Sequence, residues 1–428
     1  MPHRIRIRVY PLTVMALTLV SFCNARGAER VLYKFNFSGG PVDPSPVIFD
    51  SAGNMYGVTY WGGITNSYCG ASGCGTVFEL ARNSDGSWTR SVLYKFTGGA
   101  DGLNPASPLI FDAGGNLYGV TVWGGTYTSQ CLSGCGTVFE LSPAGSVWTH
   151  KVLFSFAGGT DGLYPSGNLL FDNSNNLYGT SQAGGAYNQG TVFELTPNGD
   201  GSLWTESLLH QFTGGSADGE LPQGLVFDAA GDLVGTADFG GSSTKCDGGC
   251  GIAYELASGS WTETVLHSFG LGEDASQPQS TLTLGPDGKF FGTSAYGGSH
   301  GLGTVFSLTA AGDGSWTEQV LHSFAGGVSD GNGPSSGLLI DGAGNLYGTT
   351  AWGGSTTCGG IGCGTVYELT RTSGGLGLNL LYSFQGGAND GATPNSLAFG
   401  PENNLYGGTT SGGNGGYNID GVLFEITR

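Results

Sequence analysis

The chain has 428 residues, 83 of which are glycine, and only 11% of its residues are charged. Acidic residues outnumber basic residues by 33 to 14, which gives a net charge of −19. This composition excludes a basic nucleic-acid-binding protein, because phosphates repel such a surface, and it is not that of a Glu- and Lys-rich helical protein.

The first 28 residues have the three parts of a secretory signal peptide. A basic segment, "HRIRIR", is followed by the apolar run "VYPLTVMALTLVSF" and then by small residues before residue 29. Cys23 is a poor site for lipid attachment, because Phe22 precedes it where a lipobox has a small residue. No later apolar run approaches the ~20 residues needed to span a bilayer. We therefore expect a signal peptide at residues 1–28 and a soluble mature domain at 29–428, secreted or extracellular, with the periplasm and the cell surface left open.

One unit of sequence is repeated along the rest of the chain, with a period of 56 to 62 residues. Its clearest marker is the run "GNLYGTT" at residues 344–350, with near copies such as "GNLYGVT" at 115 and "NNLYGTS" at 175. The last glycine of this run occurs seven times, as Gly57, Gly119, Gly179, Gly235, Gly292, Gly348 and Gly407. The chain therefore contains seven units.

Each unit contains four strand-like segments separated by glycine-rich turns. In the second unit these are "PLIFD" at 108, "NLYGVT" at 116, "GTVFEL" at 136 and "VLFSF" at 152. β-Branched and aromatic residues dominate the segments, and no stretch has helical periodicity. The first segment is a short, continuous apolar run, which is typical of a strand buried on both faces.

Four strands repeated seven times predict an all-β protein, a seven-bladed β-propeller of four-stranded blades. An orphan fourth segment, "VLYKF", lies at residues 31–35, and the sequence stops at Arg428, directly after a third segment. Joining the two completes the seventh blade. This closure favours a propeller over an open solenoid, which would want polar caps at both ends.

An Asp-x-x-Gly-Asn turn, as at residues 341–345, precedes the repeated run and links the first two strands, because Asn and Gly tolerate positive φ angles. We expect the tyrosine of the run to pack between blades, at Tyr118, Tyr178, Tyr347 and Tyr406. A glutamate recurs in the third segment and should accept a hydrogen bond from a neighbouring turn or hydroxyl, because an unpaired buried charge is costly. The run is therefore interpreted as architecture and not as a repeated active site.

The units "GNLYGTTAWGG", "GTVYEL" and "LLYSFQGG" resemble the GloVer (Gloeo/Verruco) tandem-repeat family over about residues 30–428. The resemblance implies an exported bacterial repeat protein, with no established activity and no catalytic residues to assign. Many members carry a C-terminal sorting anchor, whereas this sequence ends at Arg428, which argues against surface anchoring. The first two strands of each unit are similar, more weakly, to NHL and Kelch propeller repeats.

Eight cysteines follow Cys23, and all lie in loops between second and third segments. They form four local pairs, Cys69 with Cys74, Cys131 with Cys135, Cys246 with Cys250, and Cys358 with Cys363. Cysteine occurs only in the longest of these loops, as expected for disulfides that staple a loop, each contributing ~2 kcal/mol. Zinc is disfavoured, because the pairs have three or four intervening residues and lie in different blades.

Two further sets of residues should gather on the face that carries these loops. One is a set of aspartates from the "GGxDG" loops before each first segment: Asp101, Asp161, Asp218, Asp330 and Asp390, with Asp43 and Asp274 in degenerate copies. The other is the aromatic residue before each Gly-Gly: Trp61, Trp123, Phe239, Tyr296 and Trp352. The aspartates fit Asx-turns, with a Ca²⁺ site as the alternative. The aromatic residues fit packing between blades, with a stacking platform for sugar rings as the alternative.

Three histidines, His210, His267 and His322, occupy one position of the fourth segment. Other units carry Tyr or Phe at that position, as at Tyr94 and Phe154. Interchange with aromatic residues indicates a packing role.

No nucleophile with a base, asymmetric carboxylate pair or phosphate loop stands out in the sequence. Our first hypothesis is a non-catalytic, monomeric exported propeller, without a cofactor, that binds a glycan or a surface protein on the looped face. The second is a secreted polysaccharide hydrolase or lyase. Its candidate acid and base are Asp238 and Asp247, because "ADFGG" and "CDGGC" break the repeat pattern. The third is a structural component of the cell envelope.

Overall fold

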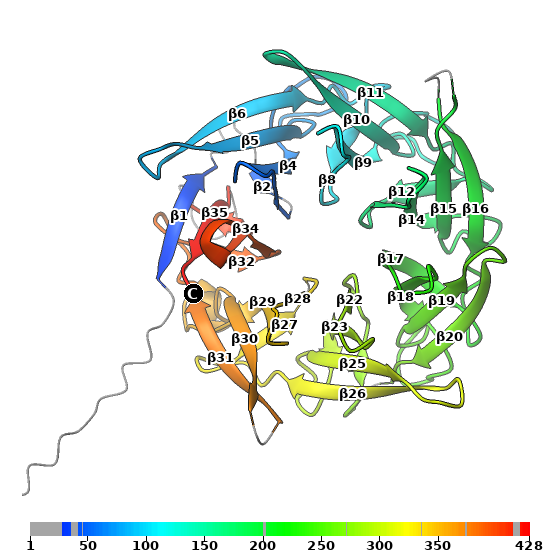
Figure 1. The fold of residues 1–428 in the computed structure, drawn as a ribbon, viewed down its shortest axis with the longest axis vertical. Coiled ribbons are helices and arrows are strands. Elements are labelled where there is room, and N and C mark those ends of the chain that lie inside the picture. The colour runs from blue at the N-terminus through cyan, green and yellow to red at the C-terminus, as the bar shows by residue number, and fades with distance from the viewer. Residues whose placement is uncertain are drawn as a thin grey trace, which may run out of the picture.

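The structure, a computed structural model, describes residues 28–35, 42–44, 46–199, 203–270, 272–334, 336–372, 375–413 and 420–428. In this part of the chain the strands form seven antiparallel blades around a central axis, and the chain visits the blades in order around the ring (Figure 1). The predicted all-β, seven-bladed propeller is therefore confirmed. The predicted signal peptide, with Cys23, lies outside the described residues except for Ala28 at its end.

The blades are numbered in chain order, and each runs from a split innermost strand to a long outermost strand. Blades 1 to 3 contain β2 (Val42–Pro44), β3 (Ile48–Phe49), β4 (Met55–Trp61), β5 (Thr76–Arg82) and β6 (Trp88–Lys95); β7 (Leu103–Pro105), β8 (Ile110–Phe111), β9 (Leu117–Trp123), β10 (Thr137–Ala144) and β11 (Val147–Ser155); and β12 (Gly162–Pro165), β13 (Leu170–Phe171), β14 (Leu177–Gly184), β15 (Thr191–Thr196) and β16 (Thr205–Gln211).

The next three blades have the same plan, except that the innermost strand of blade 4 is continuous. They contain β17 (Gly219–Phe227), β18 (Leu233–Gly240), β19 (Ile252–Ala257) and β20 (Thr262–Ser268); β21 (Ala275–Ser276), β22 (Thr283–Leu284), β23 (Phe290–Ser294), β24 (Tyr296–Gly297), β25 (Thr304–Ala310) and β26 (Trp316–Ser323); and β27 (Gly331–Pro334), β28 (Leu339–Ile340), β29 (Leu346–Gly353), the short 3₁₀ helix η1 (Cys358–Gly360), β30 (Thr365–Thr372) and β31 (Gly375–Ser383).

Blade 7 joins the two ends of the chain. It contains β32 (Gly391–Pro394), β33 (Ala398–Phe399), the 3₁₀ helix η2 (Pro401–Asn403), β34 (Leu405–Gly412), β35 (Val422–Ile426) and, as its outermost strand, β1 (Glu29–Lys34). β1 lies beside β35 (Figure 1) and pairs antiparallel with it, with Glu29 opposite Ile426. The predicted closure is confirmed.

The innermost strands differ from the prediction. The apolar run "PLIFD" of blade 2 contributes only β8, and both residues of β8 are half-buried, so the expectation of a strand buried on both faces was wrong there. The strand begins earlier, with β7, and both pieces pair with β9. The first piece was missed because three residues are too few to show a strand periodicity.

In every blade, one residue in or next to the first part of the innermost strand lies in the left-handed backbone region. In β7 this residue is Asn104, with φ 58°, and the pairing with β9 passes over it. The equivalent residues, with φ between 54° and 64°, are Asp43, Tyr164, Leu221, Gln277, Gly333 and Thr393. The turned backbone directs the Asn104 N–H at the preceding blade, where it donates to the Cys74 carbonyl at 2.9 Å. This bond gives a residue other than glycine a reason to occupy a strained region.

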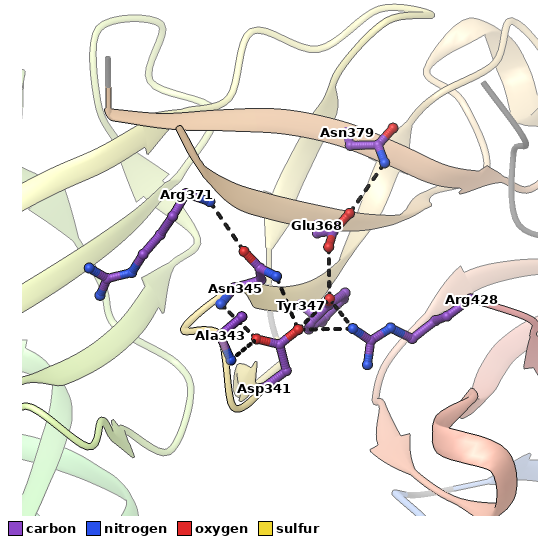
Figure 2. Close-up of polar contacts among 8 residues, drawn as sticks. All are labelled: Asp341, Ala343, Asn345, Tyr347, Glu368, Arg371, Asn379 and Arg428. Atoms are coloured by element: carbon purple, nitrogen blue, oxygen red, sulfur yellow. Dashed lines mark hydrogen bonds and ion pairs between the residues drawn. The ribbon is translucent and has the colours of Figure 1, made fainter. Parts of the chain in front are cut away.

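The Asp-x-x-Gly-Asn turn anchors the second strand, as Figure 2 shows for blade 6. Asp341 Oδ1 accepts the N–H groups of Ala343 and Asn345 at 3.0 and 2.9 Å. The Tyr347 hydroxyl lies 2.9 Å from Asp341 Oδ2 and 2.7 Å from Glu368 Oε1. The predicted hydrogen bond to the repeated glutamate is thereby confirmed, and the run at 344–350 is part of the architecture.

The tyrosines of the repeated run also pack between blades, as predicted. The Tyr347 ring lies edge-on to Phe399 of blade 7, with 5.7 Å between ring centroids, and the Tyr406 ring contacts Phe49 of blade 1 at 4.9 Å. The guanidinium of Arg428 covers the Tyr347 ring at 4.3 Å and pairs with Asp341 at 2.9 Å (Figure 2). Aromatic contacts near the turns therefore join blade 6 to blade 7 and blade 7 to blade 1.

Candidate functional site

Two kinds of loop share one face of the propeller. One kind joins the second strand of a blade to the third, and the other joins the outermost strand to the next blade. They contact each other: Asn66 Nδ2 donates to the Thr97 carbonyl at 2.8 Å, and the Gly125 N–H donates to the Gly99 carbonyl at 2.9 Å. We call this the stapled face, and the opposite face, which carries the Asp-x-x-Gly-Asn turns, the turn face.

The four predicted disulfides are confirmed. Cys69–Cys74, Cys131–Cys135, Cys246–Cys250 and Cys358–Cys363 are all bonded, with Cα atoms 4.8 to 5.4 Å apart. The second cysteine of every pair is buried, and its carbonyl accepts the N–H of the left-handed residue in the next blade. Each staple therefore fixes the carbonyl that holds the neighbouring innermost strand.

Six of the predicted aspartates lie in the loops before the innermost strands, and each of these is bonded within its own loop. Asp43 does not: it lies inside β2, at the left-handed position of that strand. Asp101 Oδ2 accepts the Thr97 N–H at 2.9 Å, and Asp330 Oδ2 accepts the Ala325 N–H at 2.9 Å. Equivalent bonds bind Asp161, Asp218, Asp274 and Asp390. These are the bonds expected of Asx-type turns. Among the described residues, no metal-capable group of three side chains joins aspartates from two of these loops.

The predicted histidines pack as expected and also reach these aspartates. The ring centroids of His210 and Phe212 are 4.6 Å apart, and the pair is edge-to-face. His210 Nε2 lies 3.4 Å from Asp218 Oδ1. Burial raises the pKa of Asp218, but hydrogen bonds from His210 and from the N–H groups of Thr213 and Gly219 outweigh burial and lower it to about 2. This contact was missed because the histidine and the loop belong to different segments of the repeat.

The stapled face carries every exposed aromatic side chain among the described residues. Tyr296 and Trp352, from the predicted set, are 53% and 41% exposed. Tyr68, Tyr127 and Tyr187 lie in the loops between second and third strands and are also exposed. Sequence reasoning missed these three, because their positions in the loops do not repeat. The exposed fractions show that the rings on this face are open to solvent.

Trp61, Trp123 and Phe239 are half-buried instead, and the first two belong to a continuous aromatic cluster on the stapled face. The Trp123 ring lies 4.3 Å from Tyr164, and its Nε1 donates to the Tyr60 hydroxyl at 3.4 Å. Tyr60 and Trp61 rings are 4.9 Å apart. We call Tyr60, Trp61, Trp123 and Tyr164 the rim cluster. It spans blades 1 to 3, and Tyr164 occupies the left-handed position of its blade.

The central channel holds a cavity of about 420 Å³ whose wall comes from all seven blades. Its lining contains no ionisable side chain; the polar groups are amides and hydroxyls such as Asn168, Gln223, Gln279, Ser336 and Asn395. Such a wall offers neutral hydrogen-bond donors and acceptors.

Asp238 and Asp247, the candidates for an acid and a base, have different surroundings. Asp238 is buried on β18, and its Oδ2 accepts a bond from Gln279 Nε2 at 3.3 Å, while its Oδ1 has no hydrogen-bond partner. Burial raises the pKa of Asp238 to about 7. Asp247 is exposed in the stapled loop of the same blade. Among the described residues, no contact joins the two carboxylates.

The comparisons with known proteins agree on a repeat and a propeller. A family model described as the Gloeobacter/Verrucomicrobia repeat matches residues 16–247 and 243–428. No curated protein matches the chain significantly.

Among solved structures, the extracellular domain of a protein described as a hybrid two-component system from B. thetaiotaomicron is similar, with a TM-score of 0.52, 12% identity, and coverage of 94% of this chain and 43% of that one. A luciferin-regenerating enzyme has a TM-score of 0.42 and 13% identity, and coverage of 94% and 96%. A gluconolactonase from Xanthomonas campestris has a TM-score of 0.38 and 13% identity, and the match covers 68% of this chain and 78% of that one. At these identities the likeness concerns the fold alone.

Proposed function

The chain belongs to the Gloeobacter/Verrucomicrobia repeat family, and on the geometry of its stapled face we propose that it is an exported, non-catalytic propeller that binds a glycan. The observation that carries the proposal is the placement of all exposed aromatic side chains of the described residues on that face, which also carries the rim cluster. An aromatic ring left in water stabilises little in the free protein, whereas it provides a flat apolar surface to a ligand.

A glycan suits this surface better than a protein partner. The apolar C–H faces of sugar rings stack on aromatic rings, and their hydroxyls require neutral donors and acceptors. The rings of the stapled face offer the first element, and the amides and hydroxyls of the channel wall offer the second. The aromatic residues are also spread over several blades, as a chain of sugars requires. A protein surface would favour one contiguous apolar patch with a polar rim.

Export is part of the proposal and rests on the disulfides. Four disulfides within one chain form and persist in an oxidising compartment outside the cytoplasm. No helix among the described residues is long and apolar enough to cross a membrane. We propose a monomer released from its signal peptide, with domain 29–428 as the binding unit.

The test is retention of the exported protein on a panel of immobilised polysaccharides and envelope fractions, scored for both bound protein and released sugar. Trp352→Ala and Trp123→Ala should each weaken retention about tenfold, because stacked aromatic anchors dominate such contacts. Val147→Ala is the matched control, because it removes an exposed apolar side chain on the turn face.

Three results would contradict the proposal. Released sugar that disappears in Asp238→Asn would instead support a hydrolase or lyase. Retention by an envelope protein fraction alone would favour a surface-protein partner. If no polysaccharide or fraction retained the protein, a structural role in the envelope would remain.

A further inference from the structure

Neighbouring blades also meet at their outermost strands, near the stapled face. Two positions four residues apart on these strands take part. The residue at the later position, such as His267 of β20, contacts the aspartate of the loop that follows its own strand. The residue at the earlier position of the next blade's outermost strand, such as Glu318 of β26, joins this pair from across the interface. The same two positions recur around the ring, so the seven interfaces can be compared directly.

The two positions carry different chemistry at different interfaces. Tyr94 and His150 are stacked rings 4.3 Å apart. In two other interfaces the positions hold Phe154 with Glu206 and His322 with Leu378. Only the interfaces between blades 3 and 4 and between blades 4 and 5 combine a histidine, an aspartate and a glutamate among the described residues.

The three side chains converge at both of these interfaces. His210 Nε2 lies 3.4 Å from Asp218 Oδ1 and 3.8 Å from Glu263 Oε2. At the next interface, His267 Nε2 lies 3.5 Å from Asp274 Oδ1, and one ligand atom each of His267, Asp274 and Glu318 lies within 4.8 Å of the others. Zinc holds nitrogen and oxygen ligands at about 2.0 Å, so tetrahedral neighbours stand ~3.3 Å apart. The measured histidine–carboxylate distances of 3.4, 3.8 and 3.5 Å are close to this value.

Buried ligand atoms at the second interface have few partners within the protein. His267 Nε2, Asp274 Oδ1 and Glu318 Oε1 are all buried, and none has a hydrogen-bond partner. The ion pair of His267 with Asp274 at 3.5 Å is a long contact, so the burial of these atoms is only partly offset unless a ligand pairs with them. The side chains of His267 and Asp274 are still 22% and 29% exposed, so an ion can reach the cluster from solvent.

We propose that His210, Asp218 and Glu263, and likewise His267, Asp274 and Glu318, bind one Zn²⁺ ion each. An imidazole nitrogen with two carboxylate oxygens is a ligand set that zinc accepts, with water as the fourth ligand. Calcium is disfavoured, because it takes six to eight oxygen ligands and avoids imidazole. Each ion joins two blades, whereas each disulfide lies within one loop.

The test is calorimetric titration of untagged, metal-free protein with Zn²⁺, with bound metal counted after dialysis by elemental analysis. We expect two Zn²⁺ ions per chain. His210→Phe and His267→Phe should each retain one ion, and the double variant none. Phenylalanine is chosen because Phe154 occupies the same position naturally.

Glu206→Gln and His322→Phe are matched controls, because their interfaces lack one member of the set; both should retain two ions. The midpoint of thermal unfolding should rise with Zn²⁺ for the native chain and stay constant for the double variant. Thermal unfolding of the double variant and of the native chain, both measured in chelator, shows whether the double variant is folded. Absence of saturable binding, or two ions still bound by the folded double variant, would overturn the proposal.

Discussion

The turn face and the stapled face are built from the same seven units and differ in how strictly the units agree. On the turn face, Tyr56, Tyr178 and Tyr347 each place the hydroxyl between a turn aspartate and a third-strand glutamate. On the stapled face, the left-handed position holds seven different residue types: Asp43, Asn104, Tyr164, Leu221, Gln277, Gly333 and Thr393. Recurring residues mark geometry that several blades share, although Val234 and Phe291 replace the tyrosine in blades 4 and 5, and varied residues mark positions that the shared geometry does not constrain.

The largest effect should come from Asp238, a buried carboxylic acid at a position whose residue varies among the seven units. Its pKa of about 7 in the folded protein exceeds the ordinary value of 3.8. Between pH 4 and 7 the folded state therefore binds a proton that the unfolded state has lost, and stability falls as the pH rises through this window. Asp238→Asn should remove this pH dependence and stabilise the protein at pH 8 by up to about 4 kcal/mol. Urea unfolding at pH 5 and pH 8 measures the difference.

Asp247→Asn controls for the loss of one negative charge, because Asp247 is exposed in the same blade. If Asp238→Asn kept the pH profile of the native chain, the buried acid would not be responsible for it.

The next effect tests a position that is uniform in all seven units. A Cβ atom on Gly348 would lie 2.6 Å from Tyr367 Cζ and 3.1 Å from Leu338 Cδ2. Both neighbours are buried, so the clash cannot be relieved outward. Gly348→Ala should lower the free energy of unfolding by about 1–3 kcal/mol. Gly342→Ala is the control in the same blade, because nothing lies within 4 Å of its Cβ. Equal unfolding midpoints for the two variants would contradict the packing role of the repeated glycine.

A staple on the varied face should contribute less to stability and more to binding. Replacing Cys358 and Cys363 by serine opens a short ring, which should lower stability by about 2 kcal/mol. The variant should also bind glycan less tightly, because Trp352 precedes the same loop and depends on its order. Unfolding in denaturant and polysaccharide retention are measured on the same preparation. A loss of stability without loss of retention would separate the staple from the binding site.

The parts of the molecule that repeat could be predicted from the sequence. Strand number, ring closure and the disulfides follow from spacings that recur seven or four times, as with Gly348 and Cys363. The first piece of each innermost strand could not be predicted, because Asn104 adopts its conformation to reach the Cys74 carbonyl of another blade. Only part of the rim cluster could be predicted, because its packing also joins different blades. Trp123 is marked by the Gly-Gly that follows it, whereas its partner Tyr164 is defined only by the packing of blade 3 on blade 2.

The smallest predicted effect tests whether the turns of different blades contribute equally to stability. Tyr347→Phe removes the hydroxyl that lies between Asp341 and Glu368, which should lower stability by about 1 kcal/mol. Tyr178→Phe is the matched control, because its hydroxyl lies between a turn aspartate and a glutamate without an arginine above its ring. Arg428 bonds the Tyr347 hydroxyl as well, so the loss at Tyr347 should exceed that at Tyr178. Equal losses in urea unfolding would mean that Arg428 acts through Asp341 and the ring face alone, and that the turns of blades 3 and 6 are energetically the same.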